Sequence, residues 1–150
     1  MLAPWNYPLT LAVSDAIPAL LAGNAVILKP DVQTTLTALW VIDLLIEAGV
    51  PAEVIPVVTG EGPVVGPLVI EEVDYVMFTG STRVGREVAR RCGERLIGNS
   101  MELGGKNAMI VRADAEIERA AEIAIRSAFA NSGQLCISME RIYVHEQVYE

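Results

Sequence analysis

The sequence is poor in several features that mark particular classes of protein. Of its 150 residues only 5% are aromatic, and it holds two cysteines and one histidine. Cys92 and Cys136 give neither a disulfide framework nor the ligand spacing of a metal site. Two free thiols suit a reducing compartment, and no targeting segment is recognisable. These absences predict a cytoplasmic protein without a metal.

Basic residues are also scarce. Lysine and arginine total 11 against 19 acidic residues, which gives a net charge of −8 and argues against nucleic acid or an anionic membrane as the main partner. Most arginines between residues 83 and 95 follow roughly helical spacing, which predicts a solvated helix face. The apolar run 9–28 is interrupted by Asp15, Pro18 and Asn24, so it predicts a buried helix followed by a strand rather than a membrane span.

The remaining composition, 52% hydrophobic and 20% charged, is that of a soluble domain with a core. Short β-branched runs alternate with helical segments through the first hundred residues. Continuous apolar strands between helices are typical of parallel sheets covered on both faces, hence of a doubly wound, Rossmann-like α/β fold. We expect strands at 25–29, 54–58 and 75–80, and helices at 34–48, after Gly62-Pro63, and at 83–95.

The pattern changes after residue 100. We expect a strand at 107–111, a helix capped by Asp114, a break at 131–133 and a strand from 141. The apolar stripe of that helix would comprise Ile117, Ala120, Ala121, Ala124 and Ala128. A boundary near Gly104-Gly105 would divide the chain into residues 1–103 and 104–150.

Two loops carry residues suited to holding a ligand. In PWNYP (4–8) the flanking prolines would fix Asn6 in a stiff, non-helical loop, although a plain turn before a helix explains it equally well. In TGSTRVG (79–85) a small-residue turn between strand and helix exposes N–H groups that suit a phosphate at Gly80 and Ser81. That spacing lacks the full glycine fingerprint, so a tight turn with a helix cap is the alternative.

Three further side chains could carry chemistry. Lys29 follows a predicted strand and would lie at the carboxyl edge of the sheet, unless it is a surface charge. In ELGGK the carboxylate of Glu102 leaves a strand beside two glycines, as a general base or merely an exposed acid. In GQLC the thiol of Cys136 lies in an accessible loop, whereas Cys92 lies within a helix and reads as a packing residue.

Taken in order, the motifs PWNYP, LKP, FTGST, MELGGK and GQLC make the chain resemble the aldehyde dehydrogenase superfamily over essentially its whole length. The resemblance implies that Cys136 attacks the aldehyde, that Glu102 activates the hydrolytic water, and that the Asn6 amide and the Cys136 N–H stabilise the oxyanion. It also implies that the small-molecule aldehyde is oxidised with NADP or NAD. The residues it assigns to cofactor binding are Trp5, Lys29, Gly80, Ser81 and Gly104.

Two departures from the family pattern modify this interpretation. Many NAD-preferring members carry an acidic residue where this chain has Val32, so NADP becomes plausible, although Asp31 could still oppose a 2′-phosphate. The family's proteins are also several times longer, which makes this chain resemble a fragment: part of the cofactor-binding domain and the start of the catalytic domain. We therefore expect the fragment alone to be aggregation-prone and inactive, and its Asn6 loop to lack a brace.

The resemblance extends to substrate and assembly. The residues in and around these motifs are similar to those of the succinate-semialdehyde dehydrogenase branch. The full-length protein is expected to be a homo-oligomer. Ile137 and Ser138 follow the nucleophile, so a redox switch between neighbouring cysteines is not available. Two alternatives stay open: an acylating relative that transfers the acyl group to coenzyme A, which the intact Glu102 disfavours, and a truncated, non-catalytic cofactor-binding module.

Overall fold

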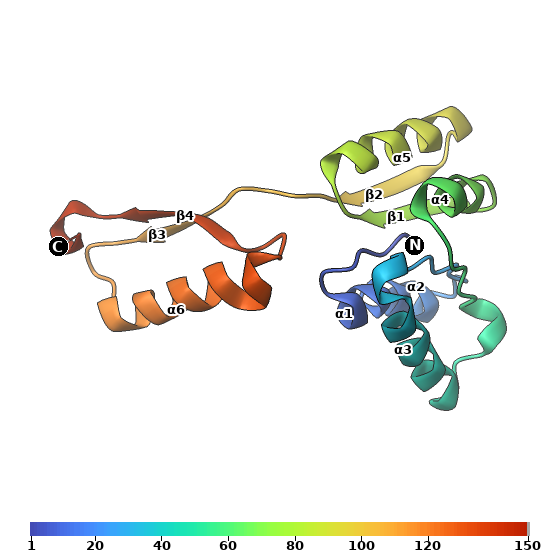
Figure 1. The fold of residues 1–150 in the computed structure, drawn as a ribbon, viewed down its shortest axis with the longest axis horizontal. Helices are drawn as coiled ribbons and strands as arrows, with labels where there is room; N and C mark the ends of the chain where they lie inside the picture. Colours follow the sequence, from blue (N-terminus) through green and yellow to red (C-terminus); the bar gives the residue numbers. More distant parts are fainter. Residues whose placement is uncertain (150) are drawn as a thin grey trace. The chain divides into compact units, whose positions relative to one another are not determined.

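The computed structural model describes residues 1–149, which form two compact units that meet between Leu103 and Gly104 in the sequence (Figure 1). Each unit has its own helices and its own pair of parallel strands. The assignment of the first unit to cofactor binding and of the second to catalysis stays a prediction. Within the described residues no helix has both the length and the hydrophobicity needed to cross a membrane.

The first unit contains two regular strands and five α-helices, with single turns of 3-10 helix at Val32–Thr34 and Ala52–Val54. Its elements are α1 (Pro8–Val13), α2 (Ala16–Leu21), α3 (Thr35–Glu47), α4 (Gly62–Glu71), β1 (Tyr75–Thr79), α5 (Thr82–Arg95) and β2 (Gly98–Glu102). The helices expected at 34–48, after Gly62-Pro63 and at 83–95 are confirmed as α3, α4 and α5.

The strands of this unit run parallel. β1 pairs with β2 from Tyr75 opposite Gly98 to Thr79 opposite Glu102. Isolated parallel bridges extend the arrangement, because Leu2 bridges both Phe78 and Lys29, and Leu28 bridges Val57. The order of paired segments is therefore 98–102, 75–79, 2, 28–29 and 57. This arrangement of helices and parallel strands confirms the expected α/β class.

The segment 1–3 occupies the middle of this order. On one side the Leu2 N–H donates to the Met77 carbonyl at 2.8 Å, and the Leu2 carbonyl accepts from the Thr79 N–H at 3.2 Å. On the other side two bonds of 2.9 and 3.0 Å join the backbone of Lys29 to residues 1–3. The expectation that the Asn6 loop lacks a brace is therefore wrong, since the residues leading into it are paired on both edges.

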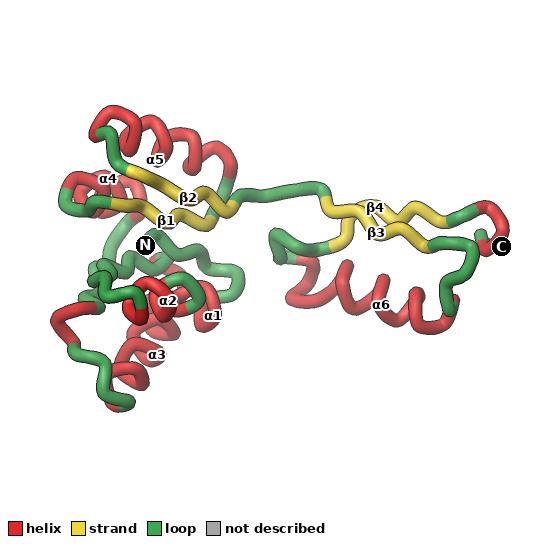
Figure 2. Tube along the Cα trace, turned by 180° about the vertical axis from the view of Figure 1, so that it is seen from behind, coloured by secondary structure: helices red, strands yellow, loops and turns green. Residues whose placement is uncertain are grey.

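The side chains of this central segment alternate between two hydrophobic clusters of the first unit. Met1 packs into a cluster with residues of α1, α2 and α3, whereas Leu2 packs into a second cluster with residues of α4, β1 and α5. Successive residues of an extended chain point to opposite faces, so one short segment contributes to both layers. Figure 2 shows α1–α3 grouped apart from α4 and α5. The expected covering of both faces follows from this arrangement.

Several sequence expectations were wrong in extent. The segments 25–29 and 54–58 are paired by hydrogen bonds but form only isolated bridges. The reason is local: Ala52–Val54 closes a 3-10 turn and Pro56 has no N–H to donate. The single helix expected from residue 9 is two short helices, α1 and α2, in which Ile17 and Leu21 are exposed.

In the second unit β3 (Asn107–Val111) pairs in parallel with β4 (Met139–Val144), and α6 (Ile117–Phe129) connects them. The helix breaks at Asn131 and Ser132, as expected, because both adopt left-handed backbone angles. Asp114 does not cap α6: the cap position is Glu116, and the Asp114 carboxylate accepts from Arg112 at 3.0 Å instead. Within residues 1–149, α6 has no buried residue, so its alanine stripe is only half-buried at best.

Candidate active site

A cavity of about 560 Å³ opens in the first unit where the parallel segments end. Its wall combines the residues after Leu2, the residues after Leu28, the turn after β1, and one side each of α4, from Gly62 to Ile70, and α5, from Arg83 to Arg91. In open α/β sheets, ligands bind outside the carboxyl ends of the strands, which is where this cavity lies. Four of the residues predicted to bind cofactor line it: Trp5, Lys29, Gly80 and Ser81.

Lys29 is the buried charge of this wall, with only 6% of its surface exposed. Burial lowers the pKa of its ammonium group, and the nearby carboxylates of Asp31 and Glu61 partly oppose that shift. Among residues 1–149 no hydrogen bond or ion pair involves the ammonium group. An under-solvated cation facing a cavity favours an anionic or hydroxyl-rich ligand, because such a ligand restores the interactions lost on burial.

Ser81 caps α5 and places the start of that helix at the cavity. Its hydroxyl accepts from the Val84 N–H at 3.3 Å, which leaves the earlier N–H groups of the helix pointing outward. The N–H of Gly80, in contrast, donates to the Glu102 carbonyl at 3.0 Å and is occupied within the sheet. The positive end of α5 thus faces the cavity through Ser81 and the residues after it, a common arrangement for phosphate.

Gly80 serves a steric purpose. A Cβ at this position would lie 2.6 Å from Cζ of Phe78, whose ring is buried beneath the turn. The sequence pattern indicated a glycine turn but not this reason for it. The small residue allows the turn to close over the aromatic ring.

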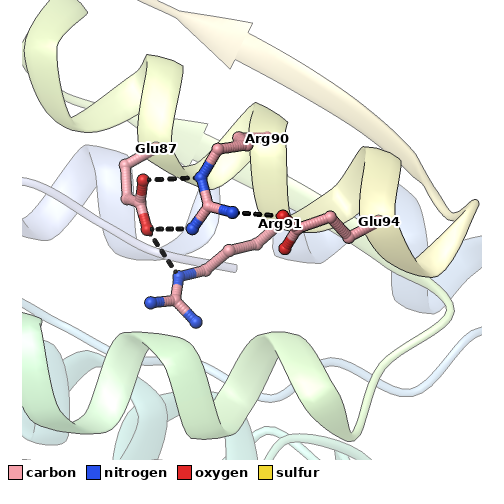
Figure 3. A network of polar contacts seen from close by, with 4 residues as sticks. All are labelled: Glu87, Arg90, Arg91 and Glu94. Carbon is pink, nitrogen blue, oxygen red and sulfur yellow. Dashed lines mark hydrogen bonds and ion pairs between the residues drawn. The ribbon is translucent and has the colours of Figure 1, made fainter.

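Charged side chains of α5 form a network beside the cavity (Figure 3). Glu87 accepts from Arg90 at 2.8 Å and from Arg91 at 2.9 Å, and Arg90 also pairs with Glu94. The hydrogen bond from Arg90 is the main reason that the pKa of Glu87 falls to about 2. Glu87 and Arg91, which both line the cavity, therefore neutralise each other.

Arg83 contributes the uncompensated charge on this side. It lines the cavity from the first turn of α5, and it forms no ion pair within the described part of the chain. The sequence had placed it on a solvated helix face, which is correct for exposure but misses its position at the cavity. Together with Lys29 it gives the wall a positive character.

The predicted general base and oxyanion donor lie in the same unit. Glu102 is the exposed last residue of β2, next to the turn that holds Gly80. Asn6 follows Trp5 and is half-buried. Within the described residues, neither Asn6 nor Glu102 lines the cavity.

The predicted nucleophile belongs to the second unit. Cys136 is a free, exposed thiol in a turn closed by the Ser138 N–H, which donates to the Leu135 carbonyl at 3.1 Å. Gly104 begins this unit, and its cofactor role stays a prediction. Cys92, as expected, is a packing residue: it is fully buried in the first unit, and burial raises its pKa.

Comparison with known proteins identifies relatives over the whole chain. The profile of the aldehyde dehydrogenase family matches residues 1–150. A Mycolicibacterium smegmatis protein named "putative succinate-semialdehyde dehydrogenase", with NADP as its stated cofactor, is 57% identical over 99% of this chain. This chain spans 29% of that relative's length.

Solved structures show the same similarity. A crystal structure described as an E. coli NADP-dependent enzyme superposes with a TM-score of 0.93 at 42% identity, over 99% of this chain and 31% of that chain. The NAD⁺ complex of an aldehyde dehydrogenase from Bacillus cereus superposes with a TM-score of 0.92 at 37% identity, over 99% and 30% of the two chains.

The steric account of the turn after β1 predicts that Gly80→Ala destabilises the chain by about 1–3 kcal/mol, because the methyl group must displace a buried ring. The matched control is Gly93→Ala in α5, where an added Cβ meets nothing within 4 Å. That change should stabilise by about 0.5–1 kcal/mol through helix propensity. Urea unfolding of both variants measures the difference, and equal stability of the two would contradict the role of Phe78.

Proposed function

Because this chain belongs to the aldehyde dehydrogenase family, we propose that it carries the cofactor cleft and the nucleophile of an enzyme that oxidises an aldehyde to a carboxylic acid with NADP or NAD. The observation that carries the proposal is the meeting of Trp5, Lys29, Gly80 and Ser81 in one cavity. These residues are separated in sequence, and the cavity volume falls in the range of small-molecule sites.

The residues of the cavity fit a dinucleotide. The under-solvated ammonium of Lys29 would bind ribose hydroxyls, and the start of α5 at Ser81 would bind the pyrophosphate. Trp5 offers an aromatic surface at the rim, with 41% of its area exposed. When bound, the nicotinamide ring supplies the hydride acceptor of the oxidation.

We propose that NADP is preferred over NAD. Val32 supplies no carboxylate to bind the 2′-hydroxyl, and the Asp31 carboxylate is engaged by the Gln33 N–H at 2.9 Å. Arg83 is a cation without an ion pair in the described residues and lies on the same cavity wall. An added 2′-phosphate would therefore gain the positive charge of Arg83 and Lys29, which we propose outweighs the opposing carboxylate of Asp31 on the same wall. The cofactor named for the M. smegmatis relative supports the same choice.

The chemical steps assigned to this chain begin at Cys136. Its thiolate would attack the carbonyl carbon of the aldehyde, forming a C–S bond and placing negative charge on oxygen. The Asn6 amide and the Cys136 N–H would donate hydrogen bonds to that oxygen. After oxidation to the thioester, Glu102 would take a proton from water as the water attacks, which releases the acid and regenerates the thiolate. The intact carboxylate of Glu102 favours water over coenzyme A as acceptor.

We propose a carboxylate-bearing aldehyde such as succinate semialdehyde as the substrate, on the basis of the relative's name. We also propose that the full-length enzyme is a cytoplasmic homo-oligomer. Many large apolar side chains are exposed in this chain, among them Leu21, Leu36 and Phe129, which further parts of a longer protein or further subunits would cover.

Cofactor binding can be followed through Trp5 once Trp40, the other tryptophan, is replaced by phenylalanine. NADP should quench Trp5 with a dissociation constant roughly 10-fold below that of NAD, because charge-assisted hydrogen bonds to the 2′-phosphate add affinity. Arg83→Ala should weaken NADP about 10-fold and leave NAD unchanged, whereas Lys29→Met should weaken both. Fluorescence titration of the parent chain and of both variants, each with NADP and with NAD, gives the six dissociation constants.

Arg86→Ala on the same helix is the control for the loss of a positive charge, because Arg86 does not line the cavity among the described residues. Tighter binding of NAD than NADP by the parent chain would refute the proposed preference. Absence of binding with either dinucleotide would refute the cofactor cleft.

The two thiols should differ in reactivity toward iodoacetamide. At pH 7.5 Cys136 should be alkylated roughly 10-fold faster than Cys92, because Cys92 is inaccessible and its raised pKa leaves little thiolate at neutral pH. Mass spectrometry of the two peptides measures both rates. Unfolding in urea should bring the rates together, and equal slow labelling of both thiols in the folded chain would count against Cys136 as nucleophile.

The substrate proposal is tested in a chimera in which these 150 residues replace the matching 29% of the M. smegmatis relative. With NADP, kcat/KM for succinate semialdehyde should exceed that for butyraldehyde, its uncharged analogue, by about 10-fold or more, since a site built for a polar group rejects the analogue that lacks it. Absorbance of the reduced cofactor gives the rates. A higher value for butyraldehyde would reject a carboxylate-bearing substrate.

A further inference from the structure

The turn that carries Cys136 is tied to the start of β3 by a single side chain. The Asn107 amide nitrogen lies 2.6 Å from the Cys136 carbonyl oxygen and 3.1 Å from the Ser138 carbonyl oxygen. Both partners are acceptors, so the NH₂ group of the amide must face them, and its two protons satisfy one carbonyl each. The side chain therefore bridges both ends of the segment 136–138.

Strand pairing leaves these carbonyls without a regular partner. The register of β3 and β4 shifts at its first step, where Asn107 opposes Met139 but Ala108 opposes Arg141. The ladder thus begins at Met139, and the residues before it lie beyond its end. The Asn107 amide takes the place of a neighbouring strand for Cys136 and Ser138.

The backbone before the thiol needs such a restraint. Asn131, Ser132 and Gly133 all have positive φ angles of 50°, 57° and 75°. Asn131 and Gly133 adopt left-handed angles readily, but Ser132 does so at a cost, so the approach to Cys136 includes one backbone position that needs support from its surroundings. The turn is held from the other side by the Ser138 N–H, which bonds to Leu135.

We propose that Asn107 is a positioning residue for the thiol of Cys136. By fixing the Cys136 carbonyl, the amide fixes the peptide plane that follows the nucleophile, and with the turn it orients the sulfur and the Cys136 N–H together. This inference rests on the proposed role of Cys136 as nucleophile. Asn107 touches no substrate and acts only through the loop.

Two reactions of the Cys136 thiol separate positioning from mere exposure. With iodoacetamide the thiolate forms a C–S bond as the C–I bond breaks and iodide leaves, without an oxyanion, so the rate of alkylation follows access and thiolate fraction. With p-nitrophenyl acetate the thiolate forms a C–S bond, the ester C–O bond breaks and p-nitrophenolate leaves, through a tetrahedral oxyanion that needs an oriented N–H. The ratio of acylation to alkylation at Cys136, measured by peptide mass spectrometry on the full-length chimera described above, reports orientation.

Asn107→Leu and Asn107→Asp keep the side-chain size and remove the donors. We expect each to lower the acylation-to-alkylation ratio roughly 10-fold or more, since small misplacements of reacting groups have effects of this size. Asn107→Ser keeps one donor and should give an intermediate ratio. Lys106→Gln is the control, because it removes the neighbouring exposed ion pair with Glu140 and should leave the ratio within about twofold.

Hydrogen exchange tests whether the Asn107 amide restrains residues 136–138. The amides of residues 136–138 should exchange faster in Asn107→Leu and Asn107→Asp, while those of α6 keep their protection and show that the unit is folded. If the larger changes unfold the unit, the Asn107→Ser variant carries the comparison. Unchanged exchange at residues 136–138 would overturn the proposal.

Faster exchange with an unchanged ratio would also overturn it, because the amide would then serve the fold alone. Failure of the proposed function has a different signature. In that case Cys136 of the parent chimera would be acylated no faster than in urea, whatever the exchange of the loop shows.

Discussion

The pairing of residues 1–3 between Lys29 and β1 is the constraint on which the rest of the first unit depends. Four backbone hydrogen bonds hold this short segment on both sides, and its alternating side chains enter both hydrophobic clusters. A parallel arrangement aligns the carboxyl ends of its members at one edge. The loop after residue 3, the residue Lys29 and the turn after β1 therefore open onto the same cavity.

That edge carries a cost in stability at one residue. Lys29 remains a buried cation without an ion pair among residues 1–149, and Gly80 gives up a side chain so that the turn can lie over Phe78. The buried charge of Lys29 costs free energy by itself, whereas the missing side chain of Gly80 is what lets the turn close over the ring. An anionic dinucleotide in the cleft, as we propose, would offset the cost of the Lys29 charge.

Features that depend on local residue pattern could be predicted from the sequence, and features that depend on contacts between distant segments could not. The helices and the α/β class followed from periodicity, and the motifs around Lys29, Glu102 and Cys136 carry chemistry that can be read from residue type and order. The strands 25–29 and 54–58 were overestimated because residues that favour a strand cannot show where Pro56 and a 3-10 turn interrupt the ladder. Asp114 could cap a helix or bind Arg112, and only the folded chain shows the second.

The sequence by itself determined the chemical groups of the site and the alternation of strands and helices, because both depend on residue identity and local spacing. Tertiary structure decided which of these groups meet. Hydrogen bonds between segments far apart in the chain set the place of residues 1–3 in the sheet and the hold of Asn107 on the Cys136 loop, and the packing of α5 places Arg83 at the cavity. Contacts of this kind depend on register and packing, which no short stretch of sequence encodes.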